Sequence, residues 1–66
     1  MQKGKVKWYN ETKGFGFIES ENGEDFFVHR TSITGMDGLL QTNQEVMFES
    51  KQDDKGPVAI NVKLVE

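Results

Sequence analysis

The residues of this sequence that suggest chemistry are three phenylalanines and the only histidine. They alternate with other residues in two short stretches: Phe15 and Phe17 in the first, Phe27 and His29 in the second. Successive side chains of a β-strand point to opposite faces, so each pair would share one face. Rings on which bases stack, beside a cation such as Lys13 that meets phosphate, are typical of a surface that binds single-stranded nucleic acid.

The two stretches are predicted to be neighbouring strands joined by a hairpin at Asn22–Gly23. Asn-Gly is a strong hairpin signal because both central residues of a type I′ turn need positive φ. If the aliphatic side chains point inward, the three phenylalanines and His29 come out side by side on the opposite face. Gly14 and Gly16 flank Phe15 and would let another backbone or a ligand approach closely.

An alternative is that the aromatic face is itself the hydrophobic core, which is where aromatic residues of strands usually lie. Against this alternative stands a second apolar set that is large enough for a small barrel. Its members are Val6, Ile18, Phe26, Val28, Ile33, Leu39, Leu40, Val46, Phe48, Ile60, Val62 and Leu64. We therefore predict that the second set forms the core and that the aromatic set faces solvent.

Five strands and no long helix are expected. A short helical turn is predicted over residues 31–33, and the strands over Lys3–Asn10, Phe15–Ser20, Asp25–Arg30, Glu45–Lys51 and Val58–Val65. The pattern favours an all-β protein, a five-stranded antiparallel barrel of the OB type. The stretch Lys13–Ile18 also resembles a motif of RRM domains, but an RRM needs two helices for which this chain has no segment.

The side on which Trp8 lies depends on whether the first strand is regular. Strict alternation would place Trp8 on the inner face and Lys7 with Tyr9 on the outer face. A bulge near Trp8 would reverse this arrangement, and the sequence permits both.

Composition limits the class of protein. The 66 residues are expected to form one domain, residues 1–66, near the lower size at which a core is self-sufficient. The lack of cysteine excludes a disulfide and a thiolate metal site, and it is compatible with a reducing cytosol. The longest apolar runs, such as residues 26–28, are too short for a transmembrane helix or a signal-peptide core, so no membrane partner is predicted.

The net charge is -3, from 8 basic and 11 acidic residues, which counts against nucleic-acid binding because such binders are usually basic. The charge is sorted along the chain, however. Residues 1–14 carry four lysines and one glutamate, and this basic part adjoins the aromatic stretch. Residues 19–25 carry four acidic residues and no basic one. Affinity would therefore depend more on stacking than on long-range attraction.

Four segments, in matching order and spacing over the whole chain, closely resemble bacterial cold-shock proteins of the cold-shock domain family. They are Gly4–Asn10, Lys13–Ile18, Phe27–His29 and Lys55–Pro57. The resemblance implies a five-stranded OB-fold barrel that binds single-stranded RNA and DNA, pyrimidine-rich strands best. It also implies a cytoplasmic, monomeric RNA chaperone without a cofactor, which melts weak secondary structure so that transcription and translation proceed, often in the cold.

The resemblance also implies the residues of the binding face. They are Lys7, Trp8, Lys13, Phe15, Phe17, Phe27 and His29, of which the last four follow from alternation alone. The family exposes the tryptophan, which favours the bulged first strand. Arg30 joins the predicted face because it stands where many members have an aromatic residue, and a guanidinium both stacks on bases and meets phosphate.

The chain departs from the family at two further places. The loop after Arg30 has no aromatic residue, whereas many members have one, and Val58 stands where glutamine is common. With the aromatic residue that Arg30 replaces, two stacking surfaces are therefore missing, one of which Arg30 replaces in part. We expect a shorter footprint or weaker binding than in an aromatic-rich member, with more sensitivity to salt.

Two other classes of function were considered. An enzyme is not predicted, because His29 has no cysteine beside it and Ser32 and Asp25 show no convergence toward a pocket, so no catalytic residue is assigned. One histidine without cysteine also argues against a metal site. A barrel that binds proline-rich peptide would carry tyrosine and tryptophan beside acidic residues, whereas phenylalanines flanked by lysines suit bases and phosphates better.

Overall fold

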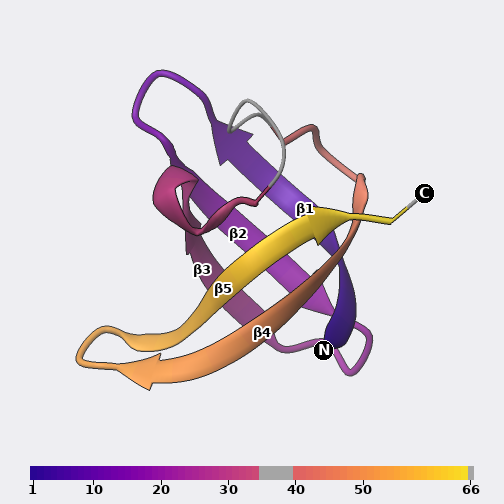
Figure 1. The fold of residues 1–66 in the computed structure, drawn as a ribbon, viewed down its shortest axis with the longest axis vertical. Helices are drawn as coiled ribbons and strands as arrows, with labels where there is room; N and C mark the ends of the chain where they lie inside the picture. The colour runs from indigo at the N-terminus through magenta and orange to yellow at the C-terminus, as the bar shows by residue number, and fades with distance from the viewer. Residues whose placement is uncertain (35–39, 66) are drawn as a thin grey trace.

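Alternating apolar and polar residues form five strands in the computed structural model of this protein, which describes residues 1–34 and 40–65. A 3-10 helix, η1 (Arg30–Ser32), follows the third strand. The strands are β1 (Gln2–Asn10), β2 (Phe15–Ser20), β3 (Asp25–His29), β4 (Glu45–Asp53) and β5 (Gly56–Leu64). They close into a barrel in the order β1-β2-β3-β5-β4, which confirms the predicted all-β, five-stranded OB-type architecture (Figure 1).

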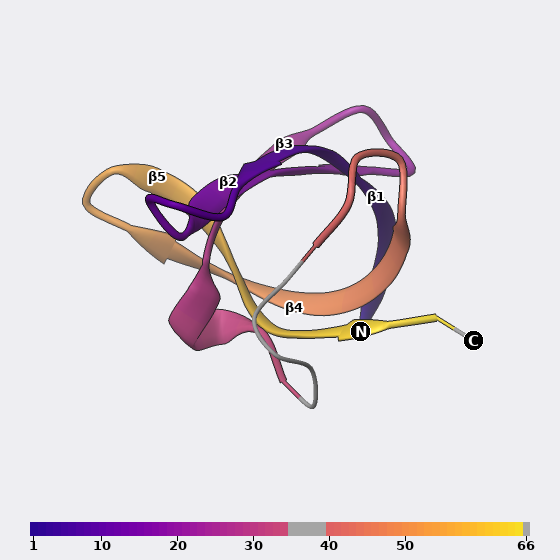
Figure 2. The ribbon, with the colours of Figure 1, turned by 90° about the horizontal axis from the view of Figure 1, so that it is seen from above.

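Four of the five contacts between neighbouring strands are antiparallel, and the contact that closes the barrel is different. There β3 and β5 run parallel, and the register pairs Phe27 with Val58. An isolated bridge between Ile33 and Val62 extends this closure. Seen from above, the strands curve around a common interior (Figure 2). The hairpin between β4 and β5 is longer than expected, because its strands pair as far as Asp53 and Gly56.

The core consists mainly of the predicted second apolar set. The buried apolar residues are Val6, Ile18, Phe26, Val28, Leu40, Val46, Phe48, Ala59 and Val62, and Tyr9, Ile33 and Leu64 pack against them. The rings of Phe26 and Phe48 meet with centroids 5.1 Å apart. Leu39, which was predicted to belong to the core, lies outside the described residues. Because Phe15, Phe17 and Phe27 are not among the buried residues, the alternative in which the outer aromatic residues form the core is wrong.

Ile60 was predicted to point inward, and this prediction is wrong. The register pairs Met47 with Lys63 but Glu49 with Ile60, so that β5 has one residue more than β4 in this interval. Asn61 absorbs the extra residue in the left-handed region, with φ 52°. The bulge shifts the alternation of β5, and Ala59 is fully buried while Ile60 is only partly so.

A second bulge lies in β1 and decides the position of Trp8. Val6 pairs with Ile18 and Trp8 pairs with Phe17, so Lys7 is an extra residue of β1. Val6 is therefore fully buried while Trp8 is 42% exposed. This confirms the bulged alternative over strict alternation, and it turns the ring of Tyr9 toward the core.

The hairpin between β2 and β3 does not contain the predicted type I′ turn. The Gly23 amide donates to the Ser20 carbonyl (2.9 Å), and the Ser20 amide donates to the Glu24 carbonyl (2.8 Å), which leaves a three-residue loop. Only Gly23 has positive φ in this loop, at 86°, as in a type I turn followed by a glycine bulge. The side-chain oxygen of Asn22 instead accepts hydrogen bonds from the Ser20 hydroxyl and the Glu24 amide.

The close packing of β1 on β2 at Gly16 generates a prediction. A Cβ at this position would collide with the carbonyl oxygen of Trp8 and lie 2.7 Å from Cα of Tyr9. We expect Gly16→Ala to lower the free energy of unfolding by about 3 kcal/mol, the upper end of overpacking costs. Urea-induced unfolding, followed by circular dichroism, measures this change.

The matched control is Gly23→Ala, which adds the same methyl group where no atom lies within 4 Å. It should cost only about 1 kcal/mol, because the strain is confined to one left-handed residue. Equal losses for the two variants would contradict the close approach at Gly16.

Candidate nucleic-acid interface

Four aromatic side chains form one connected group on the outer surface of β1, β2 and β3. We call Trp8, Phe15, Phe17 and Phe27 the aromatic cluster. Trp8 contacts Phe15 and Phe17 with ring centroids 6.0 and 5.6 Å apart, and Phe27 contacts the same two rings, each at 5.8 Å. Each ring therefore touches two others. Trp8 is exposed and the three phenylalanines are half-buried, so ring surface remains open to solvent.

Cross-strand register positions the cluster. Phe17 lies between Trp8 of β1 and Phe27 of β3, since it is paired with both. Directly opposed residues of neighbouring strands have Cβ atoms about 5 Å apart, so their rings must touch. Phe15 is paired in the same way with His29, which brings the histidine to the edge of the cluster.

His29 is held by the residue two positions further on. Its Nδ1 accepts a hydrogen bond from the Thr31 amide (3.3 Å) and lies 3.0 Å from the Thr31 hydroxyl oxygen. In the tautomer in which Nδ1 accepts from this amide, the ring N–H is at Nε2. That N–H is a donor available to a bound base.

Two cations adjoin one end of the aromatic cluster. Lys13 is exposed in the turn between β1 and β2, where its amide donates to the side-chain oxygen of Asn10 (3.0 Å). Arg30 is also exposed, and its side chain lies across Gly14, since a Cβ there would be 2.9 Å from Cδ of Arg30. The Arg30 amide donates to the Gly14 carbonyl (2.8 Å), which fixes the start of η1 beside this turn.

Lys7 lies toward the other end of the cluster and has an acidic partner. Its Nζ donates to a carboxylate oxygen of Asp25 at 3.0 Å, and this hydrogen bond, with the attraction between the charges, raises the pKa of Lys7. The sequence analysis missed this pair. The two residues are 18 positions apart, and only the register of β1, β2 and β3 brings them together.

The sequence analysis also missed a neighbour of the cluster on β5. Val58 is half-buried and pairs with Phe27 across the parallel contact. In the sequence, Val58 stood out only because the family often has glutamine there, and its place beside Phe27 was not predicted. The face that carries the aromatic cluster therefore continues onto β5, the neighbour of β3 in the barrel.

In residues 1–34 and 40–65, three features outside the aromatic cluster bear on other kinds of site: metal ligands, spanning helices and surface hollows. No group of three or more potential metal ligands occurs there, and no helix in that part is long and apolar enough to span a membrane. Two surface hollows of about 220 and 400 Å³ lie beside the start of β1 and the end of β2, and neither is lined by a member of the aromatic cluster. The aromatic surface is open, as a site for an extended chain requires.

A closed five-stranded barrel with exposed rings bordered by cations defines an OB-type nucleic-acid-binding barrel. The family described as the 'Cold-shock' DNA-binding domain matches residues 2–65. This chain therefore belongs to the cold-shock domain family, which confirms the resemblance seen in the sequence. It is a family of non-enzymatic proteins that bind single-stranded nucleic acids.

Two relatives and one solved structure illustrate the similarity. Cold shock protein CspD of Bacillus subtilis (strain 168) is 58% identical over 64 residues, covering 94% of this chain and 96% of that protein. Cold shock protein CspB of Bacillus caldolyticus is 56% identical with the same coverage. The structure of drosophila Unr CSD456 matches with a TM-score of 0.79 and 26% identity, over 98% of this chain and 26% of that chain.

The pair of Lys7 and Asp25 predicts a pH dependence at alkaline pH. A pKa raised above the ordinary 10.5 in the folded state adds stability that is complete below 10.5 and lost as pH rises through the raised value. Asp25→Asn should therefore lower the pKa of Lys7 toward 10.5. It should also slightly lower the unfolding temperature at neutral pH. At a pH above the raised pKa of Lys7, the unfolding temperature should not change. The effect is small because both side chains are nearly half exposed.

An NMR titration of the Lys7 ammonium group, with thermal unfolding at neutral and strongly alkaline pH, measures both effects. Lys3 and Glu45, 3.7 Å apart on β1 and β4, provide a looser pair for comparison through Glu45→Gln. A Lys7 pKa that does not change in Asp25→Asn would show that the pair does not form in solution.

Proposed function

We propose that this protein binds single-stranded RNA and DNA through the aromatic cluster, with His29, Lys7, Lys13 and Arg30 as polar contacts. The observation that carries the proposal is the connected group of four rings on an open sheet face, with cations beside it. Stacking on such rings contributes about 1–3 kcal/mol per base by alanine substitution. Several stacked bases give micromolar to nanomolar affinity once ordering costs are subtracted.

The same surface explains a preference for single strands. Bases in a duplex are already stacked on one another and paired, so their faces cannot reach the rings. Binding to the open strand then shifts the equilibrium between folded and open RNA by mass action. The protein would thus melt weak secondary structure without ATP, which is the action of an RNA chaperone.

The polar residues have separate roles in this proposal. His29 donates from Nε2 to a base or stacks on it. Lys13 and Arg30 contact phosphates, each contact adding roughly 0.7 to the dependence of log affinity on log salt. Lys7 must exchange Asp25 for a phosphate, so its contribution is smaller than that of an unpaired lysine.

The finer parts of the proposal are supported by membership in the cold-shock family. Residues 1–66 are proposed to be a single cold-shock domain that acts as a monomer in the cytoplasm. Pyrimidine-rich strands are proposed to bind best, and melting of transcripts is proposed to regulate transcription and translation during the response to cold.

A fluorescence titration of Trp8 tests single-strand binding. Because Trp8 is 42% exposed within the aromatic cluster, a short oligothymidine should quench its emission by stacking. The quenching should persist in moderate salt, because stacking is less sensitive to salt than phosphate contacts are. A duplex of matched length and a polyanion without bases serve as controls, and an equal response to all three would refute the stacking surface.

Alanine substitutions separate binding from folding. Phe17→Ala and Phe27→Ala should each weaken oligothymidine binding by about tenfold, the loss expected for one stacked base. Their unfolding temperatures should fall less than that of Phe48→Leu, because Phe48 is fully buried in the core. Phe48→Leu should in turn bind normally where it is folded.

Thermal unfolding and fluorescence titration of the three variants provide both measurements. If Phe27→Ala loses as much stability as Phe48→Leu and still binds oligothymidine normally, the aromatic cluster serves the fold and not the ligand. Competition between oligothymidine and a proline-rich peptide would reveal whether the same surface binds peptides instead.

A further inference from the structure

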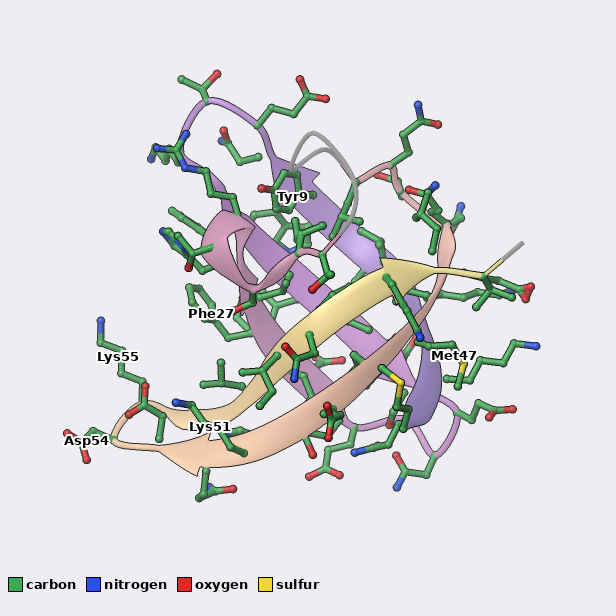
Figure 3. The ribbon with its side chains drawn as sticks, viewed as in Figure 1. Tyr9, Phe27, Met47, Lys51, Asp54 and Lys55 are labelled. Carbon is green, nitrogen blue, oxygen red and sulfur yellow. The ribbon has the colours of Figure 1, made fainter. Side chains whose placement is uncertain are left out.

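The register extends the aromatic surface across the whole barrel. Trp8 pairs with Phe17, and Phe17 pairs with Phe27. Phe27 pairs with Val58 of β5, and Val58 pairs with Lys51 of β4. Paired residues of neighbouring strands share a face, so one continuous row crosses all five strands and ends on a lysine. In Figure 3, Lys51 and Phe27 lie on either side of β5.

Lys51 has no acidic partner within residues 1–34 and 40–65, although acidic residues flank it. Glu49 and Asp53 lie two positions away on the same face of β4. The carboxylate of Glu49 accepts a hydrogen bond from the Asn61 side chain (2.8 Å), and that of Asp53 accepts one from the Asp54 amide (2.8 Å). The ion pairs of this part of the chain involve Lys3 and Lys7. The exposed ammonium group of Lys51 is therefore free to meet an anion.

We propose that Lys51 contacts a phosphate of the bound strand, and that the strand runs across β5 onto β4. This inference depends on the proposed function of the aromatic cluster. Neighbouring strands are about 4.8 Å apart, so Lys51 lies roughly 10 Å beyond Phe27 in the row. Only a strand that continues past the base on Phe27 reaches it, and the apolar side chain of Val58 fills the interval.

The test compares Lys51→Gln with Lys63→Gln. Both changes remove one positive charge from an exposed strand position, but Lys63 pairs with Met47, away from the row. Affinity for oligothymidines of about four and about eight nucleotides, within the site sizes of OB folds, is measured by Trp8 fluorescence over a range of salt. Thermal unfolding of both variants should match the wild type.

For the longer strand, Lys51→Gln should weaken binding about fivefold near 0.1 M salt and reduce the salt slope by about 0.7, the value for one released counterion. The shorter strand should bind Lys51→Gln as it binds the wild type. Lys63→Gln should resemble the wild type with both strands.

Four outcomes would overturn the inference. Equal weakening by the two substitutions would indicate a general effect of net charge. Equal weakening with the short and long strands would place Lys51 beside the cluster and not at the end of a longer path. An unchanged salt slope in Lys51→Gln, with a wild-type protein that binds normally, would exclude the phosphate contact and leave the proposed function intact. A wild-type protein that does not bind would overturn both.

Discussion

The exposed tryptophan depends on one extra residue in β1. In a regular strand Val6 and Trp8 would share a face, and one of them would be misplaced. The bulge at Lys7 lets Val6 be fully buried while Trp8 is 42% exposed. Trp8 thereby contacts the rings of Phe15 and Phe17 on β2, while Tyr9 packs against the core. A single backbone irregularity thus supplies the core with one residue and the outer surface with another.

The bulge in β5 acts in the same way on the opposite side of the barrel. Asn61 takes positive φ and lets both Ala59 and Val62 point inward, although they are three positions apart. The short side chain of Ala59 occupies the interior near the closure, where Val58 pairs with Phe27 of β3. Because β3 and β5 pair here, neither strand has an open edge at this point, and the outer surface continues from β3 onto β5.

Regular alternation explains what the sequence could predict. β2 and β3 are paired without a bulge, so counting by two placed Phe15, Phe17, Phe27 and His29 on one face correctly. Among the described residues the core strand positions followed from the same rule except on β5, where Ala59 and not Ile60 is buried. Alternation alone could not locate the bulges, because the irregularity lies in the backbone. Lys7 is an ordinary strand residue, whereas Asn61 is of a type that is rare in strands and tolerates positive φ. The pairing of Lys7 with Asp25 needed the register of three strands, which no local pattern contains.

An acidic protein that binds a polyanion must obtain its affinity from contacts other than net charge. At a net charge of -3 the chain repels nucleic acid at long range, and one of the lysines near its rings is neutralised by Asp25. Stacking is a short-range interaction that every base can make, so it acts only after the strand has arrived. The proposed chaperone gains from this balance. A protein that melts weak structure must release the strand afterwards, and strong phosphate binding would hold both open and paired forms, since both carry the same backbone charge.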